Sequence, residues 1–225
     1  MTIIWGLKMA RRKSKFRRIR EKYSIIVDGK CEKWYFQLLK KHENLQSVDI
    51  VPELPSRRKL KDVFSLVVEK IKEGYDKVIW VLDFDVLIKE DKETRKRGKK
   101  GKIQEFKECV DRLRKHKNVF VLVNTPCLEF WYLLHFRRTG RYFGNCDEVI
   151  KCLKKVELLS DYEKSERYYK KASSDIYEKL KPFQNAAIKN AESLGDFDFN
   201  DCQRAKAEIY KVFEIIGVST ERNRV

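Results

Sequence analysis

The stretch VIWVLDFD, residues 78–85, decides the fold class. An apolar run that ends in two aspartates, Asp83 and Asp85, is typical of a buried strand in an open α/β sheet. Because side chains alternate along a strand, both aspartates are predicted to point the same way, about 6.6 Å apart at their bases. Ligands of such sheets bind beyond the carboxyl ends of the strands, where paired carboxylates suit Mg²⁺. The alternative is a solvated turn, since aspartate is common in turns.

A second apolar strand carries a matching acid. The stretch YSIIVDGKCE, residues 23–32, predicts a strand that ends at Asp28, a tight turn at Gly29 and a following helix with Glu32 in its first turn. If this strand is a neighbour of the one at 78–83, Asp28 converges with Asp83 and Asp85. The sequence alone leaves that adjacency open.

The rest of the chain follows the same alternation and then changes character. Residues 47–52 and 119–123 predict two more strands, and residues 62–71 and 105–116 predict amphipathic helices. Four strands alternating with helices favour a parallel sheet built from βαβ units. From about Gly144 the pattern is helical, with segments expected at 147–156, 162–180, 182–193 and 201–216. Within them tyrosines alternate with basic residues, which indicates either helix packing or contact with nucleic acid.

A third block of interest is VNTPCLEFWYLLHF, residues 123–136. Thr125 and Pro126 favour a helix start at this point, so Glu129 falls in the first turn. One interpretation is a carboxylate stabilised by the helix dipole. The other is a group that binds metal or orients a metal ligand.

Together these blocks resemble the RloB family, Toprim-like proteins often found beside restriction-modification or abortive-infection genes. The resemblance covers residues 23–136. It implies a Toprim-like (Rossmann-like) α/β domain at residues 23–143, with a mainly parallel four-stranded sheet flanked by helices. A basic arm at residues 1–22 would precede this domain, and an all-helical region at residues 144–225 would follow it.

The resemblance also implies a chemistry. Toprim folds serve topoisomerases, primases and OLD-type nucleases, where a strand-end glutamate does acid–base work and an Asp-x-Asp pair holds Mg²⁺. This chain has Asp28 at the glutamate position, with a side chain one methylene shorter, and Asp83 and Asp85 at the positions for Mg²⁺ or Mn²⁺. Glu32 and Glu129 complete the candidate catalytic set. The third block departs from the family pattern as well, because Thr125 separates the asparagine from the proline.

The positive charge is concentrated in two segments. The formal net charge is +17, and residues 1–22 hold nine Lys/Arg against one Glu, while residues 86–102 hold eight against three acids. The second segment is predicted to be a loop lying over the carboxylates, where it would contact a polyanion. The alternative is a role in solubility. The candidate nucleic-acid contacts are Arg11, Arg12, Arg17, Arg18, Lys96, Arg97, Lys99 and Lys100.

The cysteines and the hydropathy of the chain indicate its redox state, its location and whether it enters a membrane. The six cysteines form no Cys-x-x-Cys pair, which predicts reduced thiols, no zinc site and a cytoplasmic location. Apolar runs stay far below the roughly 20 residues of a transmembrane helix, so no membrane association is expected.

Two functions therefore compete. The first is a Mg²⁺-dependent nuclease or related phosphotransfer enzyme that acts on DNA or RNA in a phage-defence (abortive infection) system. The resemblance adds a possible ATPase partner and a possible homodimer. The second is a catalytically drifted module of the same context that binds nucleic acid or a partner protein.

Overall fold

The computed structural model describes residues 21–52, 59–96, 98 and 100–218. Four parallel strands lie side by side in one sheet in the order β2-β1-β3-β4, with β2 at the edge. They span Tyr23–Ile26 (β1), Val48–Val51 (β2), Lys77–Asp83 (β3) and Val119–Thr125 (β4). The chain is thus an α/β fold, as predicted. Strands β1 and β3 are neighbours, with Ile26 opposite Trp80, so the adjacency on which the site depends is confirmed.

A fifth strand, β5 (Lys206–Ala207), pairs antiparallel with the end of β4. The predictions of four strands and of an all-helical C-terminal region were therefore wrong. A strand of two residues is too short to produce a periodic sequence signal. It is held by the next residue, because the Glu208 carboxylate accepts a hydrogen bond from the Val123 N–H at 2.9 Å.

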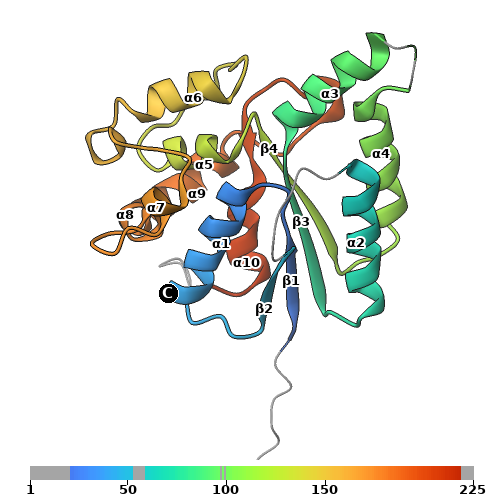
Figure 1. The fold of residues 1–225 in the computed structure, drawn as a ribbon, viewed down its shortest axis with the longest axis horizontal. Helices are drawn as coiled ribbons and strands as arrows, with labels where there is room; N and C mark the ends of the chain where they lie inside the picture. The colour runs from blue at the N-terminus through green and yellow to red at the C-terminus, as the bar shows by residue number, and fades with distance from the viewer. Residues whose placement is uncertain (1–20, 53–58, 97, 99, 219–225) are drawn as a thin grey trace, which may run out of the picture.

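Helices cover both faces of the sheet (Figure 1). One face packs against α2 (Leu60–Lys72) and α4 (Lys102–Leu113), and the other against α1 (Lys30–His42) and α5 (Leu128–Leu134). Alternate residues of β3 serve the two layers: Ile79 and Val81 face the α1 side, whereas Val78, Trp80 and Leu82 face the α2 side. Burial on both faces explains why β3 is apolar throughout instead of alternating. Among the helices that the structure describes, none combines the length and the hydropathy of a membrane-spanning segment.

The C-terminal helices extend the α1-side core, except at Phe199, which packs against Phe106 on the α2 side. They span Cys146–Leu153 (α6), Glu166–Tyr169 (α7), Ile176–Leu180 (α8), Gln184–Glu192 (α9) and Lys211–Ile215 (α10), with short 3-10 helices at Glu157–Leu159, Lys181–Phe183, Phe199–Asp201 and Glu208–Tyr210. The single helix expected at 162–180 is broken because Asp175 caps a new helix, with Glu178 completing a capping box. The interleaved tyrosines are buried, which confirms the packing interpretation; they are Tyr162, Tyr168, Tyr169 and Tyr177.

The segment after β3 is helix α3 (Phe84–Lys96), not the predicted loop over the carboxylates. Phe84 and Leu87 are buried and anchor its first turn. Two i,i+4 ion pairs, Asp85–Lys89 and Asp91–Arg95, stabilise the helix along its length. The charged residues from which a loop was predicted thus lie mostly on one exposed face of α3.

Candidate functional site

The carboxyl ends of β1, β3 and β4 meet at one edge of the sheet, and Asp83 is the last residue of β3. The turn after β4 holds this side chain. The Leu128 backbone N–H donates to Asp83 Oδ2 at 3.1 Å, and Asn124, opposite Asp83 in register, donates to Oδ1 at 3.4 Å. Asp83 is therefore fixed by two donors of the third sequence block.

Glu32 joins Asp83 from the first turn of α1. The two carboxyl groups lie close enough for each to influence the pKa of the other. Burial is the largest cause that raises the pKa of both groups, and for Asp83 the charges of Glu32 and Glu129 raise it further. Glu32 is 7 % exposed. The pair therefore retains a proton more readily than isolated carboxyl groups do.

Gly29 leaves space for the side chain of Glu32. Its φ of −110° is open to any residue, so the turn itself does not need glycine. A Cβ at this position would lie 2.9 Å from Glu32 Cδ and closer still to a carboxylate oxygen. Glycine is required because the Glu32 side chain folds back over the start of its own helix.

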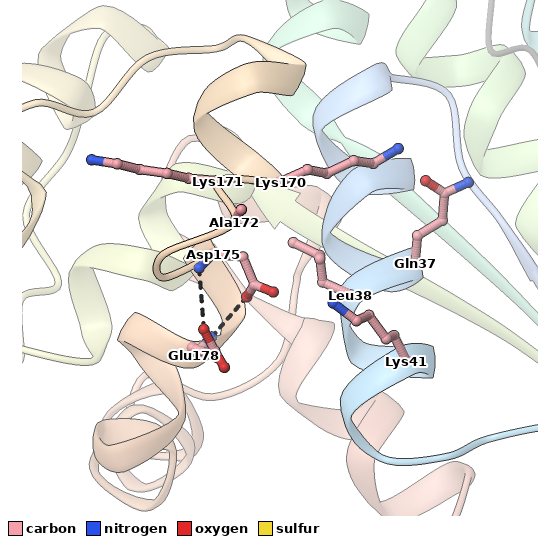
Figure 2. Close-up of a pocket in the computed structure, with 8 residues that line it drawn as sticks. All are labelled: Gln37, Leu38, Lys41, Lys170, Lys171, Ala172, Asp175 and Glu178. Atoms are coloured by element: carbon pink, nitrogen blue, oxygen red, sulfur yellow. Dashed lines mark hydrogen bonds between the residues drawn. The ribbon is translucent and has the colours of Figure 1, made fainter.

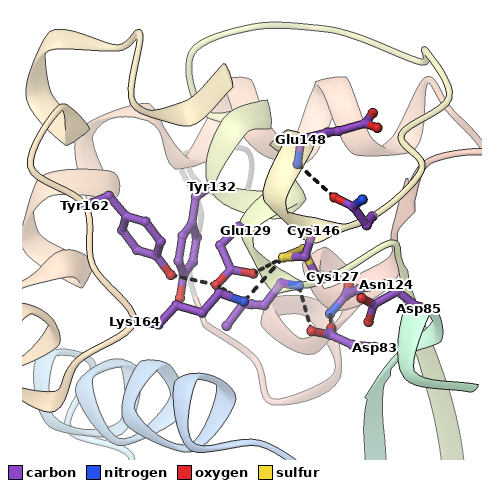
Figure 3. Close-up of a disulfide and its surroundings, with 12 residues drawn as sticks. Asp83, Asp85, Asn124, Cys127, Glu129, Tyr132, Cys146, Glu148, Tyr162 and Lys164 are labelled. Atoms are coloured by element: carbon purple, nitrogen blue, oxygen red, sulfur yellow. Dashed lines mark hydrogen bonds and ion pairs between the residues drawn. A yellow bond between two sulfur atoms is a disulfide. The ribbon is translucent and has the colours of Figure 1, made fainter. Parts of the chain in front are cut away.

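Glu129 is the third acid of the group and is only 1 % exposed. It lies in the first turn of α5, as predicted, although that helix begins at Leu128, two residues later than expected. Its Oε1 accepts a hydrogen bond from the Tyr162 hydroxyl at 2.7 Å and pairs with Lys164 Nζ at 2.9 Å. In Figure 3 the side chains of Glu129, Tyr162 and Lys164 point toward one another.

The charge of Glu129 also acts on Asp83. We therefore call Glu32, Asp83 and Glu129 the carboxylate cluster.

Asp85 is placed differently from the prediction. Because β3 ends at Asp83, Asp85 lies in the first turn of α3, and strand alternation does not relate the two side chains. The Asp85 N–H donates to the Pro126 carbonyl at 3.1 Å, and its carboxylate pairs with Lys89 at 3.0 Å. Asp85 is 8 % exposed, while the Lys89 side chain is 62 % exposed.

Asp28 stands at the edge of the cluster. Burial raises its pKa to about 7, with further contributions from the charges of Glu32 and Glu90. Its Oδ1 is buried without a hydrogen-bond partner among the described residues. Asp28 lines a cavity of about 20 Å³ with Trp80 and Glu90 among its neighbours. Glu32 is thus near, but the carboxyl group of Asp28 borders the α2-side layer.

Of the basic residues predicted to contact nucleic acid, the two that the structure describes do not lie over the acids. Arg11, Arg12, Arg17, Arg18, Arg97 and Lys99 lie outside the described residues. Lys96 and Lys100 are exposed, and Lys100 pairs with Glu108. Lys96 ends α3, about 16 Å along the helix axis from Asp85. Helix formation therefore carries this end of the basic segment away from the carboxylates.

Sequence reasoning missed a basic groove between α1 and the segment after α7. It encloses about 300 Å³ and is lined by Lys41, Lys170 and Lys171 together with Gln37. Its two acids accept backbone N–H groups in the capping box: Asp175 accepts from the Glu178 N–H, and Glu178 accepts from the Asp175 N–H. In Figure 2, Lys170 extends toward α1, where Gln37 and Lys41 lie. Lys41 is about 14 Å along α1 from Glu32.

Cys127 and Cys146 form a disulfide beside the cluster (Figure 3), which corrects the prediction of reduced thiols throughout. Cys127 precedes α5 and Cys146 begins α6. Cys146 Sγ lies 3.0 Å from Glu129 Oε2 and 3.3 Å from Lys164 Nζ. The other four cysteines are free. The cytoplasmic location, which rested on reduced thiols, stays a prediction.

The chain was compared with protein-family models, curated proteins and solved structures. No curated protein and no solved structure matched the chain. The family model described as RloB-like protein matches residues 23–216, a range that includes the carboxylate cluster and the C-terminal segment that supplies Lys164. A match over this much of the sequence confirms the resemblance read from the three blocks. The chain belongs to the RloB-like protein family.

Proposed function

We propose that this chain is a Mg²⁺-dependent nuclease, or a related phosphotransfer enzyme, that acts on nucleic acid in a phage-defence (abortive infection) system. The carboxylate cluster carries the proposal. Three acids gather at the carboxyl edge of parallel strands, which is where open α/β sheets bind ligands. The raised pKa of Asp83, caused first by burial and then by the charges of Glu32 and Glu129, supports a cation site as well, because a divalent ion would offset the crowded negative charge.

The residues present fit a hard cation. Asp83 and Asp85 would hold Mg²⁺ or Mn²⁺, with Glu32 beside them, since carboxylate oxygens are the preferred donors. Asp85 would first release Lys89, whose largely exposed side chain is free to turn into solvent. When bound, the ion would polarise a phosphoryl oxygen and stabilise the charge that develops on it.

The remaining groups have roles that follow from their surroundings. Asp28, with a pKa of about 7, is suited to accept a proton from water near neutral pH. Lys164 would offset negative charge on Glu129 or on a phosphate that reaches the cluster. The lysines of the groove would contact the phosphodiester backbone. An ATPase partner and pairing into a homodimer remain predictions from the family resemblance.

A binding module without turnover is the second candidate, and specific contacts favour it. Lys89 and Lys164 already pair with Asp85 and Glu129, so cations of the chain itself neutralise two of the acids. The carboxyl group of Asp28 also borders a small cavity with Trp80 and Glu90. Such a module would bind nucleic acid equally well with and without metal.

The deciding experiment is cleavage of labelled DNA and RNA with Mg²⁺, with Mn²⁺ and with EDTA. The Asp83→Asn/Asp85→Asn protein is compared with Asp111→Asn, which changes an exposed acid on α4. The enzyme proposal expects metal-dependent cleavage by wild type and by the control, and none by the double variant. Retention of nucleic acid in a gel shift, unaffected by EDTA and without cleavage, would favour the binding module.

A further inference from the structure

The disulfide and the acid beside it form a second group of potential ligands. The ligand atoms of Cys127, Glu129 and Cys146 all lie within 4.8 Å of one another, and all three residues are buried. Two sulfurs and one carboxylate oxygen suit Zn²⁺, which accepts both donor types and often has three protein ligands. Bonds of about 2.0–2.3 Å keep the ligands of one Zn²⁺ within about 4.6 Å of each other. In this structure the two sulfurs are close because they are bonded to each other, so they must separate on reduction before each can bind the ion. Glu129 Oε2 lies 3.0 Å from Cys146 Sγ, which keeps the carboxylate within reach of the same ion.

We propose that, when the disulfide is reduced, Cys127, Cys146 and Glu129 bind one Zn²⁺. Water would fill the fourth position of the tetrahedron. The site differs in ligand type from the hard oxygen donors of Asp83 and Asp85, because thiolates select thiophilic ions over Mg²⁺. It shares Glu129 with the carboxylate cluster, but its two sulfur ligands let it be tested by metal binding alone, without a cleavage assay.

Charge balance supports the arrangement. Two thiolates and the Glu129 carboxylate carry three negative charges, and Zn²⁺ with the Lys164 ammonium supplies three positive ones. Lys164 Nζ lies 2.9 Å from Glu129 Oε1 and 3.3 Å from Cys146 Sγ, so it already contacts two of the three ligands. In the disulfide state Glu129 and Lys164 balance each other. Each state thus avoids an uncompensated buried charge, which would be costly.

The backbone links this second site to the carboxylate cluster. Leu128 lies between Cys127 and Glu129, and its N–H donates to Asp83 Oδ2 at 3.1 Å. Pro126, just before Cys127, accepts the Asp85 N–H. If two metal–sulfur bonds replaced the disulfide, Cys127 would shift, and the turn that positions Asp83 and Asp85 would shift with it.

The chemistry balances in two steps. A phosphine reductant cleaves the S–S bond: it takes oxygen from water to become the phosphine oxide, and the two sulfurs take the two protons as thiols. Zn²⁺ then replaces those protons, which are released to solvent, and forms two Zn–S bonds and one bond to the carboxylate.

The test uses the whole chain, reduced with a phosphine under nitrogen and titrated with Co²⁺ as a coloured substitute for Zn²⁺. Excess Mg²⁺ occupies any oxygen-only site. We expect one Co²⁺ per chain, with thiolate-to-cobalt charge-transfer absorption that Zn²⁺ abolishes. Protein oxidised to the disulfide should give no such absorption until it is reduced again.

Matched variants locate the ligands. Cys127→Ser and Cys146→Ser should lose the charge-transfer band, and Glu129→Gln should weaken Co²⁺ binding by at least about tenfold. Cys31→Ser and Cys152→Ser, which change free cysteines outside the set, should bind as wild type does. A reduced wild type without the band, or a band retained in both Cys127→Ser and Cys146→Ser, would overturn the proposal. The reversible loss on oxidation needs no variant, so a folding defect cannot obscure the result.

Discussion

Burial and then the charge of Glu32 raise the pKa of Asp83, although Glu32 lies in the first turn of helix α1 and Asp83 ends strand β3. The two acids are neighbours because β1 and β3 are adjacent and parallel, which brings the turn after β1 next to the end of β3. Burial is also the largest cause that raises the pKa of Glu32. A metal ion that binds beside these acids favours their charged forms, so binding should lower the pKa of both.

The first prediction concerns Gly29. Alanine at this position would push its Cβ into the Glu32 carboxyl group, which is the mobile end of a side chain. We expect Gly29→Ala to change the free energy of unfolding by no more than about 1 kcal/mol, since the backbone conformation suits alanine. Metal-dependent activity or Mn²⁺ affinity should fall much further, because Glu32 is displaced from Asp83.

A double-mutant cycle provides the control. In a Glu32→Ala background the obstacle is gone, so Gly29→Ala should have no additional effect on Mn²⁺ affinity or cleavage. An equal loss in both backgrounds would show that Gly29 acts through the backbone and not through Glu32.

The second prediction concerns pH and Asp28. Its pKa is raised from 3.8 to about 7 in the folded chain, so the folded state binds more protons than the unfolded state between these values. The stability is therefore complete below about pH 4 and is lost as the pH rises toward 7. We expect Asp28→Asn to match wild type near pH 4. At about pH 8 it should be more stable by up to about 4 kcal/mol.

Urea unfolding across this pH range measures the difference. Asp111→Asn, at an exposed position, is the control and should follow the wild-type pH dependence. If Asp28→Asn lost as much stability as wild type between pH 4 and pH 8, burial of Asp28 would not be the source of the slope.

The third prediction concerns the pair of Lys164 and Glu129. Lys164→Met leaves a carboxylate that is 1 % exposed, with Tyr162 as its remaining hydrogen-bond donor among the residues that the structure describes. We expect a loss of about 1–3 kcal/mol in the free energy of unfolding at neutral pH. Adding Glu129→Gln should restore part of that loss, because the amide carries no charge to compensate. Additive effects of the two substitutions, measured by urea unfolding, would exclude coupling between the side chains.

The fourth prediction concerns the basic groove. Replacing Lys41, Lys170 and Lys171 by glutamine should weaken nucleic-acid binding without unfolding the protein, since all three are exposed. If each lysine contacts one phosphate, the slope of log K against log salt should become shallower by about 2–3.

The control substitutes Lys115 and Lys117, which are exposed between α4 and β4, at the opposite edge of the sheet from the acids. Fluorescence anisotropy at several salt concentrations gives both slopes. An unchanged slope in the triple variant, or an equal change in the control, would place the nucleic acid elsewhere.

Several features were predictable because they depend on short stretches of sequence. The apolar runs at 25–27 and 78–82 gave two buried strands, and the acids that follow them gave the location of the cluster. The same local reasoning failed at Asp85. A pattern of alternating residues does not reveal where a strand ends, and the packing of Phe84 and Leu87 turns the chain into α3 at that point.

The sequence by itself determined the α/β class, the acids at the strand ends and the family to which the chain belongs. Only the tertiary structure decided which groups meet at the site. Lys164 reaches Glu129, Cys146 bonds to Cys127 and β5 joins β4 because the C-terminal helices pack onto the α1 side of the sheet. These contacts join segments far apart in the chain, and burial of a common core, which no local pattern encodes, brings them together.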